Sequence, residues 1–491
     1  MPRLIPPAGW AVLLVLTACA PALPGPPGAR PVATRPDTLW VPKENPPAPA
    51  AERSAVLSDL PPELVVRRAA LTLEDVVGLA LEGNPDVRGA WATARSRAAA
   101  YGAARGAWFP TINGEASATR LQTSATQGRS AVQQTVYEPS ASFTWLLLDA
   151  GGRGGSIAAA REGLIAANWT HNATLQSVVA RTAGAYFEYA AAKALLSAQQ
   201  VSVREAETNL AAAEERRRVG VATIADVLQA RTALAQARLD LQSIEGNLFT
   251  TRGALAAATG YPATLEYDID TTAVLNPVLA VAEQVDTLIE RALSARPDLA
   301  ASRALYQQAR ARIRVAGAAR LPSLVGGGNA GVTFQPGQSG GREAYSLSLG
   351  LRLPIFNGFS WEYQRAQAVA DADAARARAE SLQQQVIYEV FSAYYALQTA
   401  TLRVATADEL LTSATESAAA ARGRYQSGVG SLLELLTAEN ALAGARAQRI
   451  QARLGWQAAL VTLAQNAGVL DLRGGNTLRL QPQLAPTDSQ P

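Results

Sequence analysis

The sequence predicts a mainly α-helical chain with four membrane-length β-strands, built from two copies of one unit. Asn84-Pro85-Asp86 returns as Arg296-Pro297-Asp298, 212 residues later, and Gly220-Val221 returns as Gly428-Val429, 208 residues later. Two long stretches without proline are dense in helix-forming residues, and two segments with alternating apolar residues precede each. The unit of roughly 200 residues is therefore a β-hairpin followed by a long helical hairpin, a tandem repeat that favours a pore or ring.

The N-terminal residues have the pattern of a secretion signal. Arg3 precedes a mostly apolar run over residues 8–16, and small residues lead into Cys19, the only cysteine of the chain. This pattern resembles the cleavage site of a bacterial lipoprotein. We therefore expect residues 1–18 to be a lipoprotein signal peptide and Cys19 to carry a covalent lipid. An ordinary signal peptide with an incidental cysteine is the alternative.

The rest of the chain divides by composition and by the repeat. Residues 19–62 are rich in proline and alanine, which favours an extended tether between the lipid and the folded body. We expect the first repeat over residues 63–262, an inter-repeat segment over 263–282, the second repeat over 283–468 and a tail over 469–491. No second cysteine is present to form a disulfide, so packing must stabilise the fold.

Each repeat ends in two long predicted helices. The stretches without proline are dense in Ala, Leu, Gln, Arg and Glu, and they predict helical hairpins over residues 155–259 and 359–467. The first helix of the first hairpin, from about Ser156 to Arg218, would be about 90 Å long at roughly 1.5 Å per residue. Helices of this length are far beyond those of ordinary globular domains.

The turns of the two helical hairpins share the same chemistry. Thr223 stands three residues before Asp226, and Ser431 stands three residues before Glu434. Each hydroxyl can accept a backbone N–H of the first helical turn, and each carboxylate can accept the N–H of the capping residue. The sequence therefore predicts a capping box after both turns.

The segments before the long helices alternate between apolar and polar residues. The pattern is clearest over Tyr137–Leu147 and Tyr345–Ile355, and it is typical of strands with one apolar face. We predict β-hairpins over residues 111–148 and 323–355 with polar connections, the first hairpin being four residues longer. Strands of about 10–13 residues are long enough to cross a bilayer when tilted.

Four such strands cannot close a barrel alone, because the backbone groups of the edge strands would face hydrocarbon. A small closed barrel needs about eight strands or more. Copies of the chain must therefore share one barrel. Two copies would provide eight strands and three would provide twelve, and the need for a ring of helices around an open passage favours three.

Composition argues against several other functions. The formal net charge of +3 is too small to indicate nucleic-acid binding. The single histidine, His171, lies in a polar helical context, where a surface or packing role is expected, since a metal site needs further ligands. The glycine-rich run 151–155 lacks the lysine of a phosphate loop and predicts a strand-to-helix transition. We expect no enzymatic activity, no metal and no cofactor apart from the lipid on Cys19.

Several motifs together resemble the TolC family of outer-membrane efflux proteins, closest to its lipoprotein branch of OprM-like and NodT-like factors. The motifs are Leu73-Glu74-Asp75-Val76, Trp145 to Gly152, Leu353-Pro354-Ile355-Phe356-Asn357-Gly358, and the turn sequences Arg218–Leu228 and Tyr425–Leu436. The resemblance covers residues from about 65 to 470. It implies a trimer in which a twelve-stranded β-barrel, with four strands from each chain, continues into a long α-helical barrel across the periplasm.

The resemblance also implies a function. The protein would be the outer-membrane exit duct of a tripartite efflux pump, passing small molecules from the periplasm to the exterior. Its partners would be a periplasmic adaptor protein and an inner-membrane transporter of the RND type. The outer-membrane component of a type I protein secretion system is the alternative. A periplasmic coiled-coil adaptor would also contain helical hairpins, but it would lack paired membrane-length strands.

The resemblance assigns roles to residues of the two turns. Adaptor docking falls to Val219, Gly220, Val221, Thr223, Gly428, Val429 and Ser431. The periplasmic gate falls to Asp226, Glu434 and Tyr425, where a ring of carboxylates would favour cations. The capping role of both carboxylates is a sufficient structural alternative. Thr437 and Gly430 stand where some family members have a second acid and an arginine, so the gate of this chain is reduced or built differently.

Overall fold

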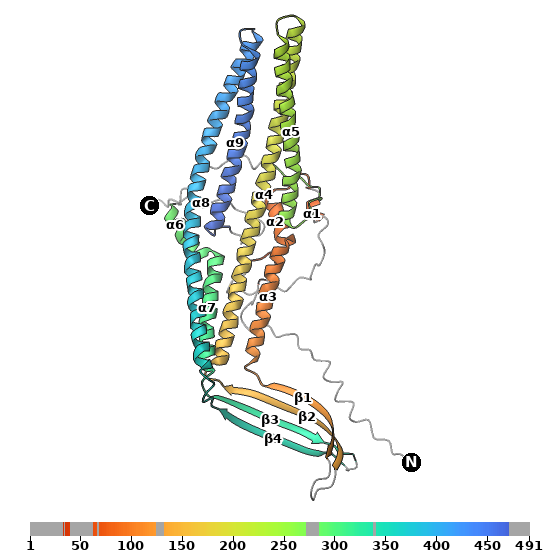
Figure 1. Ribbon diagram of the computed structural model, residues 1–491, viewed down its shortest axis with the longest axis vertical. Helices are drawn as coiled ribbons and strands as arrows, with labels where there is room; N and C mark the ends of the chain where they lie inside the picture. Colours follow the sequence, from red (N-terminus) through yellow and green to blue (C-terminus); the bar gives the residue numbers. More distant parts are fainter. Residues whose placement is uncertain are drawn as a thin grey trace, which may run out of the picture.

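The computed structural model describes residues 33, 35–39, 62–65, 68–123, 132–271, 284–336 and 340–470. The expected signal peptide 1–18, Cys19, and most of the tether, inter-repeat segment and tail lie outside the described residues. The described chain is elongated, with a β-sheet at one end and long helices running away from it (Figure 1).

The four strands form one antiparallel sheet in chain order. They are β1 (Thr111–Thr123), β2 (Val132–Leu148), β3 (Ser323–Thr333) and β4 (Arg342–Arg352). β4 ends before the predicted limit of Ile355, and Pro354, which has no N–H to donate to a ladder, lies just beyond it. Strands β1 and β4 form the two edges, so among the described strands each pairs on one side only.

Strand register gives the sheet an apolar face and a polar face. One row across the four strands is Ile112, Phe143, Gly328 and Leu347, and the next row is Asn113, Ser142, Asn329 and Ser346. The Phe143 ring covers Gly328 so closely that a Cβ there would collide with it. One apolar face and one small polar face suit a sheet between lipid and an aqueous lumen.

The helices repeat in the same order as the strands. The first repeat contains α2 (Leu73–Gly83), α3 (Pro85–Gly106), α4 (Gly152–Arg218) and α5 (Ile224–Thr259), after the short α1 (Pro62–Val65). The second contains α6 (Val285–Ala295), α7 (Pro297–Ala318), α8 (Ser360–Gln426) and α9 (Leu432–Asn466). Helices α3 and α7 begin and end 212 residues apart, whereas α4 and α8 do so 208 residues apart. The four-residue difference therefore lies in the β-hairpins.

Helix α4 is the centre of the helical layer. It contacts α3 and α5 as well as α7 and α9, and α8 packs on α7 and α9 (Figure 1). Both α4 and α8 have 67 residues, which corresponds to about 100 Å at roughly 1.5 Å per residue. The layer has two open edges, one formed by α8, with α6 packed on its middle, and the other by α3 and α5.

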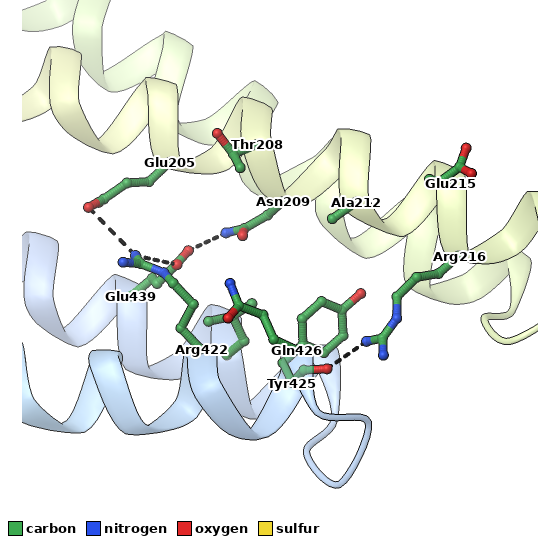
Figure 2. Close-up of a pocket in the computed structure, with 11 residues that line it drawn as sticks. Glu205, Thr208, Asn209, Ala212, Glu215, Arg216, Arg422, Tyr425, Gln426 and Glu439 are labelled. Carbon is green, nitrogen blue, oxygen red and sulfur yellow. Dashed lines mark hydrogen bonds and ion pairs between the residues drawn. The ribbon is translucent and has the colours of Figure 1, made fainter.

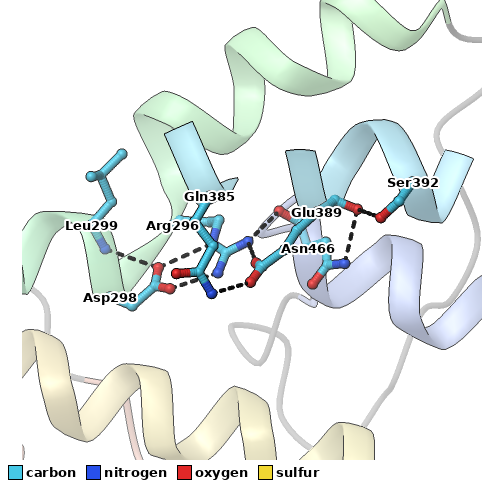
Figure 3. Close-up of polar contacts among 7 residues, drawn as sticks. All are labelled: Arg296, Asp298, Leu299, Gln385, Glu389, Ser392 and Asn466. Carbon is cyan, nitrogen blue, oxygen red and sulfur yellow. Dashed lines mark hydrogen bonds and ion pairs between the residues drawn. The ribbon is translucent and has the colours of Figure 1, made fainter. Parts of the chain in front are cut away.

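The contact between the start of α3 and α4 recurs between the start of α7 and α8, but with the charges reversed. We call these two contacts the equivalent joints. In the first repeat, Arg181 of α4 donates to Asp86 at 3.2 Å. In the second, Glu389 stands at the position of Arg181, and Arg296 supplies the cation, 2.6 Å from both Glu389 and Asp298 (Figure 3). Burial alone would raise the pKa of Asp298, but the hydrogen bonds and charge of Arg296 hold it below its usual value.

Candidate functional site at the helical-hairpin turns

The two helical hairpins end in turns far from the sheet (Figure 1). The first turn connects α4 with α5 and the second connects α8 with α9. Gly220 and Gly428 have φ of +83° and +81°, a conformation that favours glycine. Val221 donates to the carbonyl of Arg216, and Val429 donates in the same way to that of Arg424, at 2.9 and 3.0 Å. The turns therefore share one backbone geometry.

Apolar side chains project from both turns. Val219, Val221 and Val429 are 58%, 70% and 73% exposed. The structure thus brings the predicted docking residues of each repeat to one tip. Apolar groups concentrated at the end of a molecule are typical of interaction surfaces.

The two predicted capping boxes differ. Thr223 accepts from the N–H of Asp226 at 3.2 Å, and the Asp226 carboxylate accepts from the N–H of Thr223 at 2.8 Å. The hydrogen bonds that the Thr223 N–H and hydroxyl donate to the Asp226 carboxylate lower its pKa. Ser431 accepts from the N–H of Glu434 at 3.1 Å, but the Glu434 carboxylate pairs with Arg424, also at 3.1 Å. The prediction of a second complete capping box is wrong, because the longer Glu434 side chain reaches Arg424 of the preceding helix.

Tyr425 lies between the two hairpins and is buried. Arg216 of α4 donates to the carbonyl of Tyr425 at 2.7 Å, and its guanidinium lies 4.4 Å from the centre of the Tyr425 ring (Figure 2). The Tyr425 hydroxyl has no hydrogen-bond partner in the part of the chain that the structure describes. Tyr425 therefore connects the tip of the first repeat to that of the second.

A buried polar network nearby was not predicted. Glu439 of α9 accepts from the Asn209 side chain of α4 and pairs with Arg422 at 2.9 Å (Figure 2). Glu205 lies 3.7 Å from Arg422 and 3.0 Å from Arg446. All of these groups except Arg446 line a cavity of about 520 Å³ between the hairpins.

One feature of the sequence could have predicted this network. Glu439 continues the apolar stripe of α9, on which Leu432, Leu435 and Leu442 are buried. A carboxylate at such a position must find a partner, because an isolated buried charge is costly.

The turns offer exposed apolar side chains with which a partner could make contact. Within the described ranges, no group of three His, Cys, Asp or Glu residues could hold a metal ion. His171 is far along α4 from the turns and is fully buried, so packing rather than surface exposure describes it. None of the described helices is both long and apolar enough to cross a membrane.

A membrane-length sheet with one apolar face, joined to helices of about 100 Å, defines an outer-membrane channel with a periplasmic helical extension. The family model described as "Outer membrane efflux protein" matches residues 76–261 and 288–469. The chain belongs to this family, and the two matched segments lie within the two repeats.

Relatives and solved structures agree with this assignment. Protein CyaE of Bordetella pertussis is 27% identical over 391 residues, covering 77% of this chain and 80% of that protein. The probable efflux pump outer membrane protein TtgC of Pseudomonas putida is 26% identical over 405 residues, covering 81% and 82%. The Campylobacter jejuni CmeC outer membrane channel has a TM-score of 0.72 at 22% identity over 81% of this chain and 85% of that chain. The predicted fold class is confirmed, and the chain is the outer-membrane component of an efflux system.

Proposed function

We propose that the protein is the exit duct of a tripartite pump, receiving small molecules from a periplasmic adaptor and an inner-membrane transporter of the RND type. One observation carries the proposal: a single chain joins a two-faced, membrane-length sheet to long helices with exposed apolar turns. Efflux is favoured over type I secretion because relatives carry names such as "Toluene efflux pump outer membrane protein TtgC" and "Pyoverdine export outer membrane protein OpmQ".

Three copies of the chain form the duct. Members of this family are trimers that work with pump partners. The unpaired edges of β1 and β4 need neighbours in a membrane, and three copies give twelve strands. Large side chains are also exposed along both edges of the helical layer, including Tyr388 and Leu402 of α8 and Phe249 of α5. Neighbouring copies would cover them.

The adaptor binds at the helical-hairpin turns. The exposed Val219, Val221 and Val429 supply apolar contact, and Gly220 and Gly428 allow a close backbone approach. The other proposed docking residues, Thr223 and Ser431, hold the starts of the following helices. Asp226, Glu434 and Tyr425 surround the periplasmic entrance, and a lipid on Cys19 adds a membrane anchor.

The test is a Gly220→Trp variant expressed in cells that lack their own exit duct. We expect trimers to form normally and the efflux of a fluorescent dye to fall to background, because the indole blocks the turn. Gly340→Trp is the matched control, since Gly340 also has positive φ and open space around it but lies in the connection between β3 and β4. Full efflux through Gly220→Trp trimers would refute docking at this turn.

A further inference from the structure

Part of the N-terminal region lies against the first repeat, where the sequence predicts an extended tether. We call residues 33 and 35–39 the strap. The carbonyl of Ala33, a buried residue, accepts a hydrogen bond of 2.8 Å from the indole N–H of Trp91 on α3. The carbonyl of Thr38 lies 3.0 Å from Nε2 of His171 on α4. Because a carbonyl only accepts, Nε2 of His171 is the donor.

The strap has a defined shape and two further contacts. The Thr38 hydroxyl donates to the carbonyl of Arg35 at 3.0 Å and accepts from its N–H at 3.3 Å, which closes a turn. The Arg35 guanidinium lies 4.0 Å from Glu82 of α2. Leu39 packs against a buried cluster from α2, α3 and α4. Hydrogen bonds, an ion pair and apolar contact therefore all hold the strap against the first repeat.

The face of α4 that carries His171 is polar yet buried. Asn168, His171 and Asn172 lie on one face of the helix and are almost completely shielded from solvent. Burying amide and imidazole groups is costly unless they form hydrogen bonds. A peptide segment, which brings its own backbone carbonyls, suits such a surface better than an apolar helix would.

The described part of the second repeat has no such surface. The residues 208 positions after the three polar ones are Arg376, Ala379 and Glu380. Arg376 and Glu380 pair with each other at 2.8 Å, and their side chains are 64% and 63% exposed. Arg303 stands where the first repeat has Trp91. Trp91 and His171 therefore have no equivalents in the second repeat.

We propose that the surface formed by Trp91 of α3 and His171 of α4 is a docking site for the strap, and that docking ties the membrane anchor to the first repeat at a fixed level. The second half of the proposal rests on the lipid proposed at Cys19. Trp91 lies 15 residues before Gly106, the end of α3 nearest the sheet, or about 22 Å away. The chain from Cys19 to Ala33 can span up to about 50 Å. The lipid and the strap can thus be engaged together, and each raises the local concentration of the other.

Cleavage of the strap tests docking directly. Endoproteinase Asp-N cuts before Asp37 and can do so only when the strap leaves this surface. In purified full-length protein, His171→Leu removes a donor and should speed cleavage about tenfold. His171→Gln retains an N–H donor and should stay near the wild-type rate. Trp91→Phe removes the second donor and should also accelerate cleavage. Trp456→Phe is the control, since its indole donates to Thr401 in the second repeat, and it should have no effect.

Each outcome decides one part of the proposal. Unchanged cleavage in both His171→Leu and Trp91→Phe, or equal acceleration by His171→Leu and His171→Gln, would overturn docking through these hydrogen bonds. Melting followed by circular dichroism separates strap release from unfolding.

The link to the anchor is tested in lipid vesicles with a Cys19→Ser variant exported by an ordinary signal peptide. We expect severalfold faster cleavage there and no difference in detergent, and equal rates in vesicles would overturn the link. Neither test measures dye efflux, so a failure of the proposed exit-duct function would be distinguished from a failure of strap docking.

Discussion

Glu434 and Asp226 occupy equivalent positions in the two repeats, yet their carboxylates have different partners. Asp226 accepts from its own capping residue, whereas Glu434 pairs with Arg424. The aspartate side chain is one methylene shorter and stays close to its own backbone. At the proposed entrance, the charge of Glu434 is therefore partly compensated by Arg424, whereas Asp226 forms no ion pair within the described part of the chain.

This difference predicts opposite effects on ion selectivity. Glu434→Gln should lower the preference of the reconstituted channel for cations, and Arg424→Gln should raise it by exposing the Glu434 charge. Both side chains are largely solvated, so we expect permeability ratios to change by no more than about fivefold, as for a pair worth ~1 kcal/mol or less. The measurement is the reversal potential in a salt gradient across a planar bilayer. Shifts of the same sign in both variants would contradict the prediction.

His171 predicts a pH dependence of strap docking. Burial lowers the pKa of His171 from 6.5, against the raising effects of the Thr38 carbonyl and the nearby Asp37. The released strap leaves the imidazole free to take up a proton that the docked state excludes. Docking should therefore be strongest above pH 6.5 and weaken as the pH falls below it.

The measurement is Asp37 accessibility, followed by chemical labelling of its carboxylate or by Asp-N cleavage after brief incubation at pH 5.0 and at pH 7.5. Release should increase at the lower pH in the wild-type protein and remain constant in His171→Gln, which has no titratable group at that position. An identical response of both proteins would show that another group is responsible.

At the scale of elements, helices and strands follow from local sequence patterns, but their contacts do not. The period of two predicted the strands, and the stretches without proline predicted the long helices. Both patterns depend only on residues that are close together in the sequence. Helix α4 begins at Gly152, inside a glycine-rich run that local propensity excludes from a helix. There the Asp149 side chain accepts from the N–H of Arg153 and holds the first turn.

The turns and the strap also have contacts that local sequence patterns do not predict. Gly220 and Gly428 marked the turns because a positive φ selects glycine. The partner of Glu434 could not be predicted, because Arg424 lies on the opposite helix of the hairpin. The strap was predicted as a free tether from its proline content, whereas its position depends on Trp91 and His171, which are distant in sequence.

The reversed charges at the equivalent joints predict a rescue. Arg296→Asn should lower stability by about 2–3 kcal/mol, because Asp298 and Glu389 lose their shared, largely buried cation. Adding Glu389→Arg recreates the arrangement of Asn84, Asp86 and Arg181 and should recover much of the loss. The midpoint of chemical denaturation is the measurement.

Removal of an exposed pair provides the control for this rescue. Arg376→Asn breaks the solvated pair with Glu380 and should change stability by no more than about 0.5 kcal/mol. A double variant less stable than Arg296→Asn would show that the two joints are not interchangeable.

At the scale of the whole molecule, the described chain is a segment of a ring with two unsatisfied sides. The sheet leaves the outer edges of β1 and β4 unpaired, and the helical layer ends at α8 on one side and at α3 and α5 on the other. In a membrane the strand edges cannot remain open, because their N–H and C=O groups would lose hydrogen bonds worth several kcal/mol each. The duplication supplies two units per chain, so three chains give six similar units around one axis.

The protein extracted in mild detergent should therefore have about three times the 51.4 kDa mass of one chain, as measured by light scattering corrected for detergent. Introducing charge on the helical edges, with Phe249→Asp or Tyr388→Asp, should reduce the trimer fraction, because a buried, unpaired carboxylate would be placed between neighbours. Val221→Asp is the matched control, since its side chain is equally apolar and exposed but lies at a turn. A trimer that tolerates both edge variants would place those side chains on its free surface. A stable wild-type monomer would leave the outer edges of β1 and β4 without hydrogen-bond partners in the membrane and would contradict the shared barrel. The edge variants thus test the contacts between helices of neighbouring copies, whereas the wild-type mass tests the shared barrel. The barrel must close even if the helices pack differently.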